Sequence, residues 1–180
     1  MSQSFETDRL LLREVLPSDD QKMFELDSNP EVHRFLGNKP VKSILESRDM
    51  IAKIHWQYQQ NGIGRWAVVL KETNEFIGWS GLKLEQNVNG HKQFFDLGYR
   101  FIQQYWGKGY ALEAALAFVE YGFNTLHIDT ICAFTYAGNL ASRKVLEKAG
   151  LHCVEKFLYD ESDAIWYEIH NPDRIIGKLL

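Results

Sequence analysis

The sequence predicts an α+β fold, in which a mixed, mostly antiparallel sheet carries helices on both sides. Residues 65–102 contain three strand-like segments joined by short turns, which is the pattern of an antiparallel meander. Helix-like and strand-like segments alternate along the rest of the chain, and no internal repeat or Pro- or Ser-rich linker divides it. We therefore expect a single domain over residues 1–180.

The first third of the chain is predicted to contain one strand and three helices. The apolar run at residues 9–15 is flanked by charge and followed by Pro17, which is typical of a strand. Residues 18–21 predict a helix start, because a capping residue is followed by acids in the first turn. Residues 28–31 predict a second, short helix that Gly37 can close. Apolar residues recur at roughly helical spacing over residues 43–60, which predicts an amphipathic surface helix.

The meander and the segments after it complete the predicted order. The meander strands are residues 65–70, 76–84 and 93–102, with turns at 71–74 and 87–90. After them we predict a helix at 109–122, a strand at 128–134, a helix at 139–148, and strands near 154–159 and 164–169.

Charge and cysteine content exclude several classes of protein. The net charge of −4 and the pI near 5.9 argue against a nucleic-acid-binding protein, because phosphate binding needs a surplus of Lys and Arg. Cys132 and Cys153 lie 21 residues apart without C-x-x-C partners, and the histidines show no metal-ligand spacing. We expect free thiols in a reducing cytosol and no metal site.

The sequence gives no sign of a membrane or export segment. The first residues contain acids and no continuous apolar core, unlike a signal peptide, and no 18-residue apolar run occurs. We therefore expect a cytoplasmic protein that does not bind membranes.

Residues 105–111 read Y-W-G-K-G-Y-A and lie between a predicted strand and a predicted helix. A glycine loop at this place points backbone N–H groups at the helix N-terminus, which is a site for an anion such as a pyrophosphate. The G-x-x-x-x-G-K-[ST] motif is absent, and Leu112 stands where a dinucleotide motif has its third glycine. A glycine pair that only turns the chain is the alternative.

Together with residues 136–151, this loop resembles the GNAT family of N-acetyltransferases, which bind acetyl-CoA and transfer its acetyl group to an amine. The family's loop, Q/R-x-x-G-x-G/A, looks like the run Trp106, Gly107, Lys108, Gly109, Tyr110 and Ala111. Trp106 departs from the expected Gln or Arg. The family's helix motif, N-x-x-[SA]-x-x-x-[YL]-x-K-x-G-[FL], looks like residues 139–151.

Three further segments, residues 7–13, 29–32 and 96–99, resemble the RimJ/RimL-like branch, which includes ribosomal-protein N-terminal acetyltransferases. The resemblance reaches to about Tyr167 and implies the GNAT acyl-CoA N-acyltransferase fold. It implies an acetyl-CoA-dependent enzyme whose acceptor is a protein N-terminus or a small-molecule amine, chosen by residues 20–60. A homodimer is what many relatives form.

The resemblance also implies how the cofactor is held. The N–H groups of residues 107–111 would bind the pyrophosphate, with Lys108 either on a phosphate or in solvent. The pantetheine arm would pair with the backbone edge at Phe101 and Ile102, where the family's two parallel strands splay apart. The Asn139 amide suits the pantetheine amides, and Ser142 lies one turn further along that helix.

Two candidate catalytic residues follow from the same resemblance. Asp96 precedes a bulge-like Gly98-Tyr99 position, and it is the candidate base that removes the amine's proton; the alternative is a surface carboxylate. Many relatives place a Tyr where Leu146 stands, so Ser142 is the candidate partner of the leaving thiolate; the alternative is a Ser bonded to the preceding turn. A backbone N–H near Phe101 or Ile102 would hold the oxyanion. No acyl-enzyme is needed, because the amine can attack the thioester directly in a ternary complex.

Other interpretations remain open at this point. A non-catalytic acyl-CoA-binding or sensing domain would keep the same loop, and a nucleotide-binding α/β domain would bind ATP or NAD there. The tryptophans at positions 56, 66, 79 and 166 are predicted core or interface residues, although Trp56 or Trp79 could line an acceptor pocket. The sequence does not decide whether the tail at residues 175–180 is ordered.

Overall fold

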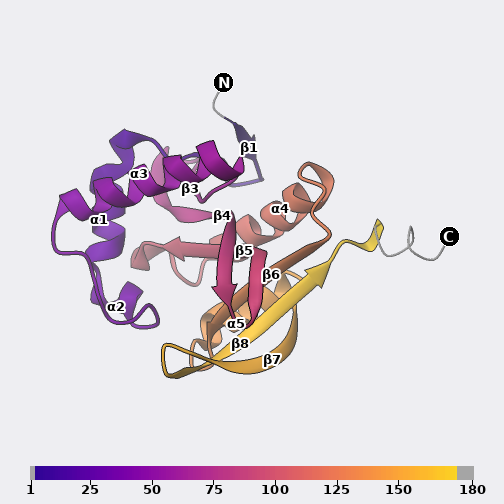
Figure 1. Ribbon diagram of the computed structural model, residues 1–180. Coiled ribbons are helices and arrows are strands. Elements are labelled where there is room, and N and C mark those ends of the chain that lie inside the picture. Colours follow the sequence, from indigo (N-terminus) through magenta and orange to yellow (C-terminus); the bar gives the residue numbers. More distant parts are fainter. Residues whose placement is uncertain (1–2, 174–180) are drawn as a thin grey trace.

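The computed structural model describes residues 3–173 of the 180-residue chain. Within these residues, eight strands form one sheet in the order β1-β2-β3-β4-β5-β6-β8-β7. Every neighbouring pair runs antiparallel except β5 and β6, which run parallel and lie side by side in Figure 1. The predicted α+β fold with a mixed, mostly antiparallel sheet is confirmed. The tail at residues 175–180 lies outside the described residues.

The N-terminal elements follow the predicted order with one addition. Strand β2 (Leu10–Glu14) and helix α3 (Ile44–Asn61) confirm the predicted strand at 9–15 and helix at 43–60. A short strand, β1 (Ser4–Glu6), pairs with β2 and has no counterpart among the predicted elements. The elements between β2 and α3 are η1 (Pro17–Asp19), α1 (Asp20–Ser28) and α2 (Pro30–His33).

The remaining elements also match the predicted order, and most boundaries move by only a few residues. The meander consists of β3 (Trp66–Leu70), β4 (Glu75–Val88) and β5 (His91–Phe101). After it come η2 (Gln103–Tyr105), α4 (Tyr110–Asn124), β6 (Thr130–Tyr136), α5 (Leu140–Lys148), β7 (His152–Tyr159) and β8 (Ser162–His170).

Local capping explains where the early helices begin. The Asp19 carboxylate accepts a hydrogen bond from the Leu16 N–H (2.7 Å), and the Asn29 side chain accepts one from the Glu31 N–H (2.9 Å). Helix α2 nevertheless ends at His33, before Gly37, and the chain continues through hydrogen-bonded turns such as Asn38 N to His33 O (3.1 Å). The expectation of a helix closed by Gly37 is therefore only partly met.

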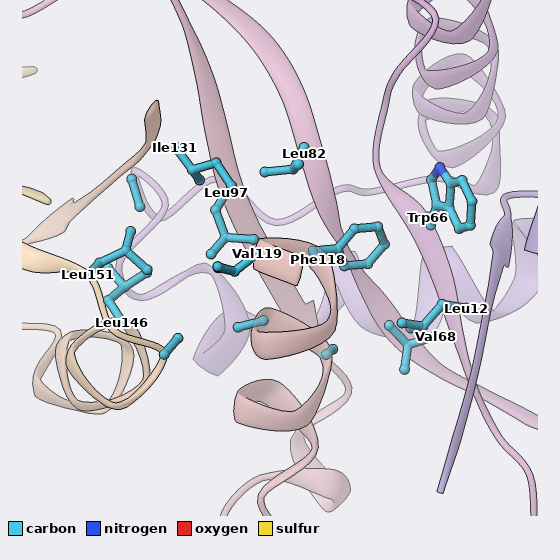
Figure 2. Packing of buried hydrophobic residues seen from close by; sticks show 14 of the residues in the cluster. Leu12, Trp66, Val68, Leu82, Leu97, Phe118, Val119, Ile131, Leu146 and Leu151 are labelled. Atoms are coloured by element: carbon cyan, nitrogen blue, oxygen red, sulfur yellow. The ribbon is translucent and has the colours of Figure 1, made fainter. Parts of the chain in front are cut away.

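Helices cover both faces of the sheet, as predicted. On one face, Phe118 of α4 and Leu146 of α5 belong to one core cluster with Leu12, Val68, Leu82 and Leu97 of the strands; Figure 2 shows this cluster. On the other face, α1 and α3 bury apolar residues against strands β3 and β4; these residues are Met23, Leu26, Ile51 and Ile54. Each fully buried Leu or Phe side chain contributes about 1.5–3 kcal/mol, so the two cores fix the sheet between the helix layers.

The pairing of β5 differs on its two sides. Against β4 its register runs without a shift from Gly78↔Phe101 to Gln86↔Gln93, so the bulge-like position expected at Gly98-Tyr99 is not present in this ladder. Against β6 the pairing is limited to Phe95↔Ile131 and Asp96↔Cys132. Beyond Asp96 the two parallel strands are no longer paired, which opens the sheet along the second half of β5.

Candidate active site

A cleft of about 420 Å³ lies where β5 and β6 separate. Its walls come from residues 96–100 of β5, residues 134–136 of β6, the start of α5 and residues 35–37 after α2, together with Arg65, side chains of β4 and the β7–β8 hairpin. Asp96, Asn139 and Ser142, which the sequence singled out separately, all line this one cleft. Tyr99 also lines the cleft, and Leu146 closes its floor from α5.

Asp96 is buried rather than on the surface, and it is 6% exposed. Its Oδ2 pairs with the guanidinium of Arg65, which also donates to the Asp96 and Gly81 carbonyl oxygens. Burial raises the pKa of the Asp96 carboxyl, and the charge of Arg65 opposes that rise. The second oxygen, Oδ1, has no hydrogen-bond partner within residues 3–173, so a ligand in the cleft can reach an acceptor there.

Gly98 gives Arg65 the room to make this pair. A Cβ at position 98 would lie 2.5 Å from the Arg65 Nη2 and 2.7 Å from its Cζ. An acid at position 96 and a glycine at position 98 therefore have one cause, because both positions contact the same buried guanidinium. Sequence reasoning noticed the two residues but missed Arg65, which is 31 positions away from Asp96.

The start of α5 presents two polar side chains to the cleft. Asn139 caps the helix, with its Oδ1 accepting from the Ser142 N–H (3.2 Å), so only its Nδ2 donor lacks a partner among the described residues. The Ser142 Oγ lies 3.1 Å from the Tyr99 hydroxyl, which reaches across from β5. The Asn139 Nδ2 is therefore available to donate to a carbonyl oxygen of a ligand.

The glycine loop lies beyond the end of β5 and is not part of the cleft wall. Gly109, the N-cap of α4, has a φ of +85°, which only glycine adopts without strain. The first helical hydrogen bond runs from Glu113 N to Gly109 O (3.0 Å). The N–H groups of residues 109–112 therefore precede the helical ladder, and they have no acceptor within the described part of the chain.

A cluster of side chains that the sequence did not reveal holds this loop from behind. The Glu113 carboxylate accepts from the Thr7 hydroxyl (2.6 Å) and from Arg9 Nε (2.7 Å), and it pairs with Arg9 Nη2 at 2.6 Å. Arg9 also donates to the Lys108 carbonyl (3.0 Å) and lies 4.5 Å from the centre of the Tyr110 ring. Partial burial raises the pKa of Glu113, but the hydrogen bonds from Thr7 and Arg9 outweigh this effect and hold that pKa below its usual value.

The backbone edge expected at Phe101 and Ile102 is partly used by the protein itself. Ile102 N donates to Ile77 O (3.0 Å), so this N–H belongs to the ladder with β4. The adjacent Phe101 points its backbone groups to the opposite edge, and the Trp106 indole donates to its carbonyl (2.7 Å). Trp106, which departs from the family pattern, therefore ties the glycine loop to the end of β5.

The two tryptophans considered for an acceptor pocket behave differently. Trp79 lines the cleft, with the guanidinium carbons of Arg65 and Arg100 at 5.4 Å and 5.0 Å from its ring centre. Trp56 is 59% exposed on α3 and is not part of the cleft wall. Arg100 Nη1 in turn pairs with Oδ1 of the buried Asp27 of α1 (2.5 Å). Residues 20–60, which are expected to select the acceptor, therefore reach the cleft through this pair.

Cysteine, metal and membrane features complete the description. Cys132 is buried, which raises the pKa of its thiol to about 12, and Cys153 is exposed. Among residues 3–173, no group of His, Cys, Asp and Glu side chains is arranged to hold a metal ion. Within the same range, no helix has the length and apolar character needed to span a membrane.

Comparisons with known proteins agree with this geometry. Residues 9–152 match the family model described as "Acetyltransferase (GNAT) domain". The Bacillus subtilis protein YoaA, named as an uncharacterized N-acetyltransferase, is 35% identical over 173 residues, which cover 93% of this chain and 96% of YoaA.

Solved structures show the same fold. A GNAT-family acetyltransferase from Bacillus anthracis has a TM-score of 0.78 at 24% identity and covers 94% of this chain and 99% of its own. A RimL ribosomal L7/L12 α-N-protein acetyltransferase, solved with coenzyme A, has a TM-score of 0.80 at 17% identity and covers 93% and 98%. The ribosomal-protein-S5-alanine acetyltransferase of Vibrio fischeri has a TM-score of 0.75 at 21% identity and covers 95% and 98%.

Proposed function

The chain belongs to the GNAT acetyltransferase family, and we propose that it moves the acetyl group of acetyl-CoA to a primary amine, either a protein N-terminus or a small-molecule amine. The observation that carries the proposal is that two features occur along one segment, the cleft beside the second half of β5 and the glycine loop that follows this strand. The unpaired N–H groups of residues 109–112 suit a pyrophosphate, and the cleft with Asp96 and Ser142 begins where β5 and β6 separate.

The residues at the loop fit the cofactor. Gly109 turns the chain so that α4 starts directly after it. The N–H groups of residues 109–112 can then hold an anion without a side-chain charge. Arg9 supports the fit, because its guanidinium pairs with the Glu113 carboxylate and so offsets a negative charge in the first turn of α4. The open edge of β5 and the free Nδ2 of Asn139 suit the amide-rich pantetheine arm.

Bound acetyl-CoA would supply a thioester carbonyl that an amine can attack. In this proposal Asp96 accepts the proton that the acceptor amine must lose, through its unpaired Oδ1. Burial favours this role, since a raised pKa makes the carboxylate a better base than an exposed aspartate. Arg65 fixes the orientation of the carboxylate, and Ser142 faces the leaving sulfur.

A thiol-release assay with an amine panel tests this function. Acetyl-CoA is offered with peptides bearing free N-termini, with the same peptides N-terminally blocked, and with diamines. We expect thiol release with at least one class of free amine, together with a matching mass increase of the acceptor, and a loss of most of the rate in Asp96→Asn. Tight acetyl-CoA binding without release for any amine would instead support a sensing domain and overturn the enzymatic proposal.

A further inference from the structure

Tyr99 contacts Ser142 in the cleft, and neither the family match nor the sequence assigns a role to this contact. Its hydroxyl crosses from β5 to the first turn of α5, where it lies 2.9 Å from the Ser142 carbonyl oxygen and 3.1 Å from Ser142 Oγ. Both residues line the same cleft as Asp96. The phenol therefore lies against the one hydroxyl that was proposed to face the leaving sulfur.

This contact bears on the alternative role of Ser142, a hydroxyl bonded to the preceding turn of its own helix. Within residues 3–173, Ser142 Oγ makes no such bond, and its one partner is the Tyr99 hydroxyl. Its own N–H is taken by the Asn139 side chain (3.2 Å). The hydroxyl is thus held on the cleft side of the helix by a residue 43 positions away.

An inventory of protons shows what the pair can donate. The Tyr99 phenol has one proton and two acceptors within reach, the Ser142 carbonyl oxygen and Ser142 Oγ. When the phenol donates to Oγ, the Ser142 proton stays free to donate to a group in the cleft. Burial raises the pKa of Tyr99, and the hydrogen bond with Ser142 works against that rise. The phenol therefore stays protonated at neutral pH and acts as a fixed donor.

We propose that Tyr99 is a positioning residue that holds the Ser142 hydroxyl so that its O–H donates to the leaving sulfur of coenzyme A. The inference rests on the proposed function. In the reaction the amine nitrogen forms a bond to the thioester carbon, and the carbon–sulfur bond breaks with its electron pair remaining on sulfur. The amine's proton passes to Asp96 or water. The sulfur leaves as a thiolate, stabilised by the hydrogen bond from Ser142 and later protonated by solvent, so no oxidant or further reactant is needed.

The binary complex with CoA offers a test that needs no acceptor. The ultraviolet absorbance of the thiolate reports the titration of the CoA thiol, free and bound to the protein. We expect the bound thiol to titrate at lower pH in the wild type than in solution. Tyr99→Phe and Ser142→Ala should each reduce the thiolate fraction at fixed pH about tenfold, the effect of one hydrogen bond to a charged group. The double variant should show no further loss, because the two residues act as one unit.

Matched variants separate positioning from general packing. Ser142→Thr keeps the hydroxyl and should keep the wild-type titration. Tyr121→Phe removes another partly buried phenol hydroxyl, one that donates to Gln3 (3.0 Å) far from the cleft, and it should change nothing. In all variants the affinity for CoA at low pH, where the thiol is protonated, should stay unchanged.

Three outcomes would overturn the inference. If the wild-type thiol titrates as in free CoA, no donor reaches the sulfur, although the acetyltransferase proposal would stand. If Tyr99→Phe weakens CoA binding at low pH without moving the titration, Tyr99 only packs the cleft. If the wild type does not bind CoA, both the inference and the function on which it rests are wrong.

Discussion

Gly98 lacks a side chain because the Arg65 guanidinium occupies the place where a Cβ would lie. Arg65 cannot retreat without cost, since it is buried and bonded to Asp96 and to the carbonyl oxygens of Asp96 and Gly81. A charge this deep is stable only while its partners stay in place. The fixed position of the Asp96 carboxylate and the steric demand at Gly98 are therefore two results of one buried pair.

This arrangement predicts that Gly98→Ala lowers the free energy of unfolding by about 1–3 kcal/mol, through overpacking against Arg65. Urea denaturation measures the loss. Gly138→Ala is the matched control, because its Cβ would make an ordinary contact, 3.6 Å from the Phe35 ring, and should cost less than about 0.5 kcal/mol. Equal effects at the two glycines would show that Arg65 does not confine position 98.

His33 makes stability depend on pH. It is 7% exposed, and both ring nitrogens are buried without a hydrogen-bond partner among the described residues. Burial and the nearby Arg100 charge lower its pKa, and Asp27 opposes this only in part. The unfolded chain therefore binds the proton first as the pH falls, so the folded state loses stability from about pH 6.5 downwards until the folded-state pKa is passed.

His33→Gln should remove this loss. We expect the urea midpoint of the wild type to fall more steeply than that of the variant between about pH 7 and pH 5. His152→Gln, at an exposed position, serves as the control and should keep the wild-type slope. Parallel curves for wild type and His33→Gln would contradict the lowered pKa.

The sequence placed the candidate residues better than it identified their partners. Asp96, Asn139 and Ser142 were named from motifs and lie on one cleft, whereas Arg65 and Tyr99 were not assigned any role there. Contacts across 31 and 43 positions depend on strand register and helix docking, and no local pattern records these. The functional roles of Asp96 and Ser142 stay predictions until they are tested.

Among the elements, α4 depends on a connection to the N-terminal strands. Glu113, in its first turn, binds Thr7 and Arg9 of the β1–β2 connection, 106 and 104 positions away. Both ends of this connection are therefore fixed to the helix that carries the glycine loop. The contact also explains why residues 7–9 matter to a loop that lies a hundred positions further along the chain.

We predict that Glu113→Ala lowers the free energy of unfolding by about 1–2 kcal/mol, since it removes charge-assisted hydrogen bonds that are partly exposed to solvent. Hydrogen exchange should become faster in β1 and at the amides of α4 from Glu113 onwards, which are the first in that helix with acceptors. Glu120→Ala, on an exposed position of the same helix, should leave both measurements near wild type. Unchanged exchange in Glu113→Ala would mean that the connection does not hold the loop.

The predicted elements succeed where periodicity and turns are strong and fail where segments are short. The long helix α3 and the meander strands match their predicted ranges within a few residues. Strand β1 is three residues long and is recognisable only through its pairing with β2. The end of helix α2 at His33 was mispredicted for a similar reason, because four residues carry too little periodic signal to mark a boundary.

At the scale of the whole molecule, the site exists because one sheet is interrupted at one place. The family resemblance implied that two parallel strands separate beside Phe101 and Ile102, but it did not give the residue, Asp96, after which the pairing of β5 with β6 ends. A register limited to two residue pairs follows from long-range packing. The helices on the two faces hold the rest of the sheet together. The separated strands can therefore stay open without loss of the core, which leaves room for a ligand beside β5.

The central claim is that acetyl-CoA binds at the glycine loop before α4, and isothermal titration calorimetry with acetyl-CoA tests it most directly. The comparison is between wild type, Gly109→Val and Gly90→Val. Both glycines have a positive φ, +85° and +76°, and Gly90 lies at the β4–β5 turn, so the backbone strain is matched. A Cβ at Gly109 adds only an ordinary contact, 3.4 Å from Arg9 Nη2.

We predict that wild type and Gly90→Val bind acetyl-CoA with similar affinity, and that Gly109→Val, although folded, loses measurable binding because the N–H groups at the start of α4 are no longer presented. Equal affinity in both variants would place the cofactor elsewhere on the molecule. No binding by the folded wild-type protein would contradict the account as a whole.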